Sequence, residues 1–183
     1  MSTFKSNFPT RAQITNVFGV IVFIVFTWSL YRMTWFLPSW LKGSIQDVLT
    51  TSSFVMVFAL FESLIILGTL LLFAFLLPVK VYRDTFVPTS TTLLTILACF
   101  SVYLLQSKVD IIYQLELREL VLYPILILVA VIILVFLLSL IFNRFESPAR
   151  IISSIAERMT VFLYIYLPLS ILSILIILIS LVF

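Results

Sequence analysis

One carboxylate stands alone inside a long apolar stretch. Glu62 is the only ionisable residue between Val48 and Val79. A charged side chain at the centre of a bilayer costs about 2.5–3.5 kcal/mol even on the more permissive insertion scales, so such residues are usually retained for a function. Glu62 is therefore the candidate ion or proton site, and we expect the helix face that it shares with Ala59 and Ile66 to pack on protein.

Arg32 is the candidate partner of this carboxylate. It lies near the outer end of the first apolar stretch, from which its long side chain can reach inward toward Glu62. The alternative is an aromatic belt, because Trp28, Arg32 and Trp35 recur at i, i+4 and i+7 and place the guanidinium between two indoles. Tyr31 belongs to the same belt, and Trp28, Trp35 and Trp40 are then interface anchors. The two interpretations are compatible in part.

A third group of side chains is small or weakly polar. Thr91, Thr95, Ala98 and Cys99 lie in one apolar stretch and would let neighbouring helices approach closely in lipid. Helix packing is the favoured interpretation, and the lining of a pore is the alternative.

Several kinds of reactive site are missing from the sequence. The chain has no histidine, one cysteine and three glycines. Histidine-ligated haem or zinc, histidine acid–base catalysis, an internal disulfide and a glycine-rich phosphate loop are thereby excluded. We therefore expect no catalytic residue, no metal and no cofactor, and we predict that the protein is not an enzyme.

One acidic cluster offers a weaker alternative. Asp110, Glu116 and Glu119 lie near Lys108 and Arg118. Carboxylates at the outer face could serve a lipid-modifying enzyme as acid and base. Their spacing matches no known catalytic pattern, so a solvated loop is the favoured interpretation.

The composition is that of a membrane protein. Hydrophobic residues make up 63% of the chain, charged residues 10%, and the mean hydropathy is +1.28, whereas soluble domains carry about 25% charged residues. The 11 basic residues are spread singly, which argues against a nucleic-acid partner. The lipid bilayer is the expected partner, and residues 1–183 form a single transmembrane domain.

The sequence predicts an all-α integral membrane fold, a bundle of five transmembrane helices with short amphipathic interfacial helices. A spanning helix needs about 20 mostly apolar residues, and five stretches satisfy this length approximately. They are residues 14–37, 53–77, 90–106, 120–142 and 159–183. The third is short and rich in Ser and Thr, so a re-entrant segment is the alternative there. Two connections, 147–159 and 40–49, have the pattern of surface helices, with Ser147 as the cap of the first.

Charge asymmetry sets the expected orientation. With five crossings, seven basic residues fall on the side of the N-terminus and four on the other side. The seven are Lys5, Arg11, Lys80, Arg83, Arg144, Arg150 and Arg158. Because basic residues accumulate on the cytoplasmic side, the N-terminus is predicted inside the cell and the C-terminus outside, with the cell membrane as the location.

Two functions fit this pattern. The first is a non-catalytic accessory or structural subunit that contacts other membrane-protein chains, or a homo-oligomer. The second is a small proton- or cation-coupled transporter or channel that uses Glu62.

Overall fold

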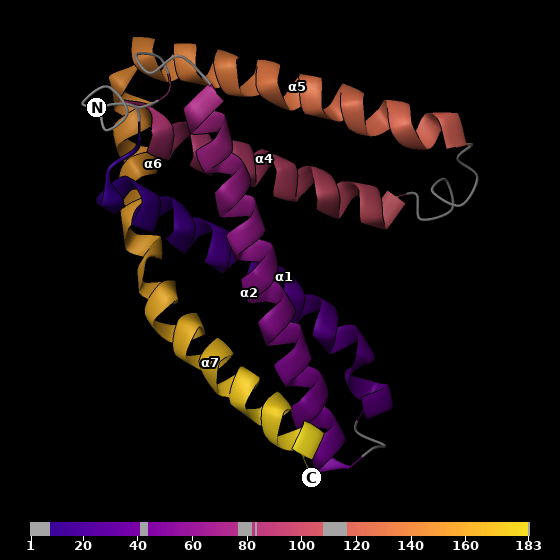
Figure 1. Ribbon diagram of the computed structural model, residues 1–183. Helices are drawn as coiled ribbons and strands as arrows, with labels where there is room; N and C mark the ends of the chain where they lie inside the picture. The colour runs from indigo at the N-terminus through magenta and orange to yellow at the C-terminus, as the bar shows by residue number, and fades with distance from the viewer. Residues whose placement is uncertain (1–7, 41–43, 77–81, 83, 108–116, 183) are drawn as a thin grey trace. The chain divides into compact units, whose positions relative to one another are not determined.

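The fold comes from a computed structural model that describes residues 8–40, 44–76, 82, 84–107 and 117–182. Within these ranges the regular structure is entirely helical, and no strand occurs. The helices, in chain order, are α1 (Arg11–Trp40), α2 (Ile45–Leu76), α4 (Phe86–Ser107), α5 (Leu117–Arg144), α6 (Glu146–Met159) and α7 (Val161–Val182) (Figure 1).

Five of the helical segments are long and apolar enough to cross a membrane. These segments lie on α1, α2, α4, α5 and the continuous run of α6 and α7. The predictions of an all-helical chain and of five apolar helices are thereby confirmed. The third is an unbroken helix of 22 residues, about 33 Å at about 1.5 Å per residue, so its backbone does not reverse as a re-entrant segment would.

The first two helices begin with the same local device. The backbone N–H of Thr10 donates to Gln13 Oε1 at 2.8 Å, and the Gln13 N–H donates to Thr10 Oγ1 at 3.3 Å. The backbone N–H of Ser44 donates to the Asp47 carboxylate at 3.1 Å, and the Asp47 N–H donates to Ser44 Oγ at 3.2 Å. Each reciprocal pair satisfies two N–H groups that a helix start leaves free, which fixes where α1 and α2 begin.

Two predicted boundaries were wrong. The outer surface helix expected over 40–49 does not exist as a separate element, because Trp40 ends α1 and α2 already begins at Ile45. The Ser44 cap explains this early start. Ser147 was expected to cap the later surface helix, yet α6 begins at Glu146 and Ser147 lies within its first turn.

The contacts of the chain form two compact units, one of residues 1–9 and 74–153 and the other of residues 10–73 and 154–183. In the second unit α1 packs on α7. Val17, Ile21 and Phe26 of α1 are buried. Two ring contacts tie the helices together, Phe23 with Phe162 and Phe26 with Tyr166, each with ring centroids 4.6 Å apart.

Gly19 permits a close approach of α1 to the chain between α6 and α7. A Cβ added there would lie 2.8 Å from the Cα of Thr160 and 2.9 Å from its backbone nitrogen. Thr160 is the turn between α6 and α7, where its hydroxyl donates to the Glu157 carbonyl at 2.7 Å. The missing side chain of Gly19 therefore lets α1 rest directly on the backbone of that turn.

In the first unit α4 packs on α5, and Figure 1 shows the two helices side by side. The buried face of α5 holds Val135, Ser139 and Phe142. Most other residues from Leu126 to Ile141 are apolar and exposed, with Leu126 61% and Leu137 50% accessible. Exposed apolar rows of this kind are rare on soluble monomers.

Replacing Gly19 by alanine should destabilise the packing of α1. The new Cβ meets backbone atoms that cannot move aside, and overpacking of this kind costs about 1–3 kcal/mol. The measurement is the unfolding free energy of the purified chain in mild detergent.

Gly68→Ala is the matched control. A Cβ at Gly68 meets nothing within 4 Å, and alanine has the higher helix propensity by about 1 kcal/mol. Gly68→Ala should therefore leave stability unchanged or raise it, and equal losses for the two variants would contradict the close approach at Gly19.

Candidate functional site

Glu62 lies near the middle of α2, which runs from Ile45 to Leu76. It is at least about 21 Å from either end of the helix at about 1.5 Å per residue. On its face Ala59 is 1% exposed and Ile66 is half-buried, but Glu62 itself is exposed. The carboxylate thus stands at the edge of the packed face, beside the exposed rings of Phe58 and Phe61.

The structure does not join Arg32 to Glu62. Both side chains are exposed, and within the described part of the chain neither has an ion-pair partner. The roles expected for the two residues therefore stay predictions. What the structure adds is that the single chain leaves the Glu62 carboxylate uncompensated by any described cation.

In the aromatic belt, the ring of Tyr31 contacts both Trp28 and Trp35. The ring of Tyr31 lies 5.7 Å from Trp28 and 5.5 Å from Trp35, between centroids. Tyr31 thus contacts both indoles, and the position expected for the guanidinium of Arg32 stays a prediction. Trp35 is exposed, as an interface anchor requires, while the side chain of Trp40 lies outside those that the structure describes.

The small residues of α4 differ in how far they are buried. Thr91 is 7% exposed, and its carbonyl accepts a hydrogen bond from Thr95 Oγ1 at 2.9 Å. Ala98 is half-buried, whereas Thr95 and Cys99 are exposed. Packing is concentrated in the first turns of α4, and the expected packing role of the later residues stays a prediction.

Two buried hydroxyl pairs were not expected from the sequence. Thr85 and Ser139 hydrogen-bond at 2.7 Å across 54 residues of chain, and Tyr82 bonds to Ser90 at 3.0 Å. Burial raises the pKa of Tyr82 to about 12, although its hydrogen bond to Ser90 acts in the opposite direction. Tyr82 therefore stays neutral at physiological pH. Its position eight residues before Ser90 gave no periodic signal that would have revealed the pair.

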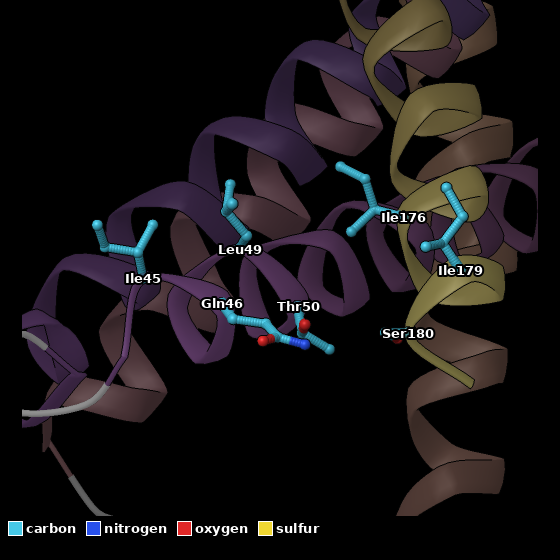
Figure 2. A pocket seen from close by; sticks show the side chains of 7 residues that line it. All are labelled: Ile45, Gln46, Leu49, Thr50, Ile176, Ile179 and Ser180. Atoms are coloured by element: carbon cyan, nitrogen blue, oxygen red, sulfur yellow. The ribbon is translucent and has the colours of Figure 1, made fainter. Parts of the chain in front are cut away.

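A groove of about 350 Å³ lies between the start of α2 and the end of α7, and we call it the α2–α7 groove. Gln46, Leu49 and Thr50 line its α2 side, together with Ile45. Ile176, Ile179 and Ser180 line its α7 side. Figure 2 shows the amide of Gln46 beside Thr50, with Ser180 on the facing helix.

A second, apolar hollow lies between the same two helices. This second hollow, of about 220 Å³, is lined on α2 by Phe54, Val57, Phe58 and Phe61. Ile174, Ile177 and Leu178 line it on α7. Glu62 lines neither hollow. Within the described residues there is also no group of three His, Cys, Asp or Glu side chains placed to hold a metal ion.

The chain matches no protein-family model, no curated protein and no solved structure. Its function is therefore argued from the residues and their geometry.

The Thr85–Ser139 bond should couple α4 to α5. A double-mutant cycle with Thr85→Val and Ser139→Ala should give a coupling free energy of about 0.5–1.5 kcal/mol, as is typical of interhelical hydroxyl bonds in membranes. Unfolding of the four proteins in mild detergent measures it.

Ser63→Ala supplies the control for this cycle. Ser63 is equally buried, but it donates to the Ala59 carbonyl of its own helix at 2.7 Å. Combined with Ser139→Ala it should show no coupling. A Thr85–Ser139 coupling no larger than that of the control would count against an interhelical bond.

Proposed function

We propose that this chain is a non-catalytic, multi-pass integral membrane protein that acts as an accessory or structural subunit of a membrane complex, or as a homo-oligomer. In this proposal the five apolar helices cross the cell membrane, with the N-terminus in the cytoplasm and the C-terminus outside. Helix length and composition support the crossings, and the excess of basic residues on the side of the N-terminus supports the orientation.

The observation that carries the proposal is the exposed carboxylate of Glu62. A hydrocarbon core is about 30 Å thick, and Glu62 lies about 21 Å or more from either end of α2. When α2 is centred on the core, its short side chain therefore cannot reach the headgroups. Facing lipid, the charge would cost about 2.5–3.5 kcal/mol.

A second chain removes this cost when it brings a basic group to the same depth. An Arg or Lys on a partner helix would pair with Glu62 out of contact with lipid, and the pair would specify which chain binds there. The exposed side chains around Glu62 support such an interface, because Phe58, Phe61 and Ile65 are each more than half accessible and would pack on the partner helix.

Glu62→Gln should dissociate the assembly. Removal of one partner of a desolvated ion pair costs about 3–5 kcal/mol, which corresponds to a loss of at least about a hundredfold in affinity. The measurement is the particle mass after extraction in mild detergent. The wild-type particle should exceed the 21.0 kDa of one chain, and the Glu62→Gln particle should approach that value.

Thr69→Val is the matched control, since Thr69 is exposed on the same helix face two turns away and its hydroxyl donates to Ile65 of its own helix. It should leave the assembly intact. A wild-type particle that contains one copy and no other chain would remove the support for this function.

The alternative is a small proton- or cation-coupled transporter or channel that uses Glu62, which the depth of this carboxylate favours. Under this alternative Glu62→Gln folds but abolishes proton or cation flux in proteoliposomes. Flux that the substitution does not alter excludes Glu62 as the transport site.

A further inference from the structure

α6 connects the ends of two helices that cross the membrane in the function proposed above, and the inference drawn from it rests on that proposal. The apolar run of α5 ends at Phe142, and α6 begins four residues later at Glu146. At its other end a single residue, Thr160, separates α6 from α7, which carries no charged residue. When both neighbours span, the two ends of α6 lie at the same face of the membrane.

This connection constrains the direction of α6. Its 14 residues measure about 21 Å at about 1.5 Å per residue. If α6 stood upright on the membrane, one of its ends would lie about 21 Å from the boundary. Single-residue connections reach only about 3.6 Å each, so they cannot bridge that distance. α6 must therefore run along the membrane face.

The backbone at Thr160 permits this change of direction. The Thr160 N–H donates to the Glu157 carbonyl at 3.2 Å, and the Leu163 N–H donates to the Thr160 carbonyl at 3.0 Å. Both bonds join residues three apart, whereas an α-helix joins residues four apart. The regular hydrogen-bond ladder is thus interrupted between α6 and α7.

α6 leaves an apolar strip uncovered by the rest of the chain. Ala156 is 0% exposed and marks the packed side of the helix. Pro148, Ile151 and Ile155 lie together on another side, because residues three or four apart share a helix face. All three are exposed, Ile151 to 62% and Ile155 to 47%. We call these three residues the α6 strip.

The charged residues of α6 are sorted around the α6 strip. At about 100° per residue, Glu146, Arg150 and Glu157 lie roughly 130–170° from its middle, on the opposite side of the helix. Arg158 lies only about 50° from its middle. The side chain of Arg158 is exposed and has no ion-pair partner within the described residues. A free guanidinium thus borders the strip, while both carboxylates point away from it.

This arrangement fits the boundary of a phospholipid layer. Amphipathic helices at membrane surfaces bury their apolar side about 5–10 Å into the boundary between headgroups and acyl chains. A guanidinium beside that side can pair with the oxygens of a phosphate group. Because the connections hold α6 along the membrane face, phospholipid is the partner available to the whole length of the strip.

We propose that α6 binds the phospholipid layer itself. The α6 strip enters the boundary of the acyl chains, and Arg158 pairs with a lipid phosphate. The two carboxylates on the opposite side stay in water. This surface is separate from the interface around Glu62 and needs no partner chain.

Fluorescence quenching on the full chain tests this proposal. In a Cys99→Ser background, Ile151→Cys, Ile155→Cys and Glu157→Cys each carry a bimane label in phosphatidylcholine vesicles. One quencher is a lipid with a nitroxide high on its acyl chain, and the other is iodide on both sides of the membrane. Lipid quenching should be at least threefold stronger at the two strip positions than at Glu157→Cys, and iodide quenching should show the reverse order.

Arg158→Gln tests the phosphate contact, and Arg150→Gln is its matched control. Both variants remove one positive charge from α6, but Arg150 lies on the side away from the strip. Arg158→Gln should lower lipid quenching of the label at Ile155→Cys at least twofold, whereas Arg150→Gln should leave it unchanged.

Iodide quenching at the two strip positions as strong as at Glu157→Cys would overturn the proposal. So would protection of both positions from both quenchers, which would place a second chain over the strip, or equal effects of the two arginine variants. A label at Leu140→Cys, on the exposed face of α5, separates these failures from a failure of the proposed membrane crossing. Iodide instead of lipid would then quench Leu140→Cys as well.

Discussion

The constraint on which the account depends is the large apolar surface that the described helices leave exposed after folding. On α5 alone, long apolar residues from Leu126 to Ile141 remain largely exposed after folding. Water around such a surface would favour aggregation. Hydrocarbon reverses this penalty, and it also requires every backbone N–H and C=O to be paired within its own segment. The membrane that we propose as its surroundings would explain both the exposed surface and the exclusively helical form of the described residues.

Packing between helices must then come from shape and from a few polar contacts, because lipid competes equally well for apolar side chains. The chain uses both. Because Gly19 has no side chain, α1 can lie directly against the backbone of Thr160. The Thr85–Ser139 hydrogen bond links the start of α4 to α5. Stacked rings such as Phe26 on Tyr166 add contact area. The α1–α7 pair and the α4–α5 pair therefore each have their own specific contacts.

The sequence predicted the features that depend on composition, and it missed those that depend on which residues meet. Apolar runs of sufficient length located all five long helices, since length and composition can be read directly from the sequence. The start of α2 was misplaced because the reciprocal bonds of Ser44 and Asp47 extend a helix beyond its apolar run. The ring contacts of Tyr31 with the two indoles depend on side-chain direction, which the sequence alone does not give.

For the candidate site too, the sequence revealed what depends on composition and missed what depends on contacts. The sequence identified Glu62 as the exceptional charge, because one ionisable residue in an apolar run is visible without a structure. Its exposure and the α2–α7 groove could not be predicted, since both depend on which faces of α2 meet other helices. The proposal that other chains complete this protein rests on that exposure, because a charge that a single chain leaves uncovered requires a partner only when lipid is the surrounding medium.

The most direct test of that medium is a spin label at Leu137 on the exposed face of α5, with Cys99 replaced by serine and the protein in lipid vesicles. Power saturation measures collisions of the label with oxygen, which concentrates in hydrocarbon, and with a water-soluble nickel chelate. A lipid-facing α5 predicts high oxygen and negligible nickel accessibility. Ready access of the nickel chelate to Leu137 would contradict the account at its foundation.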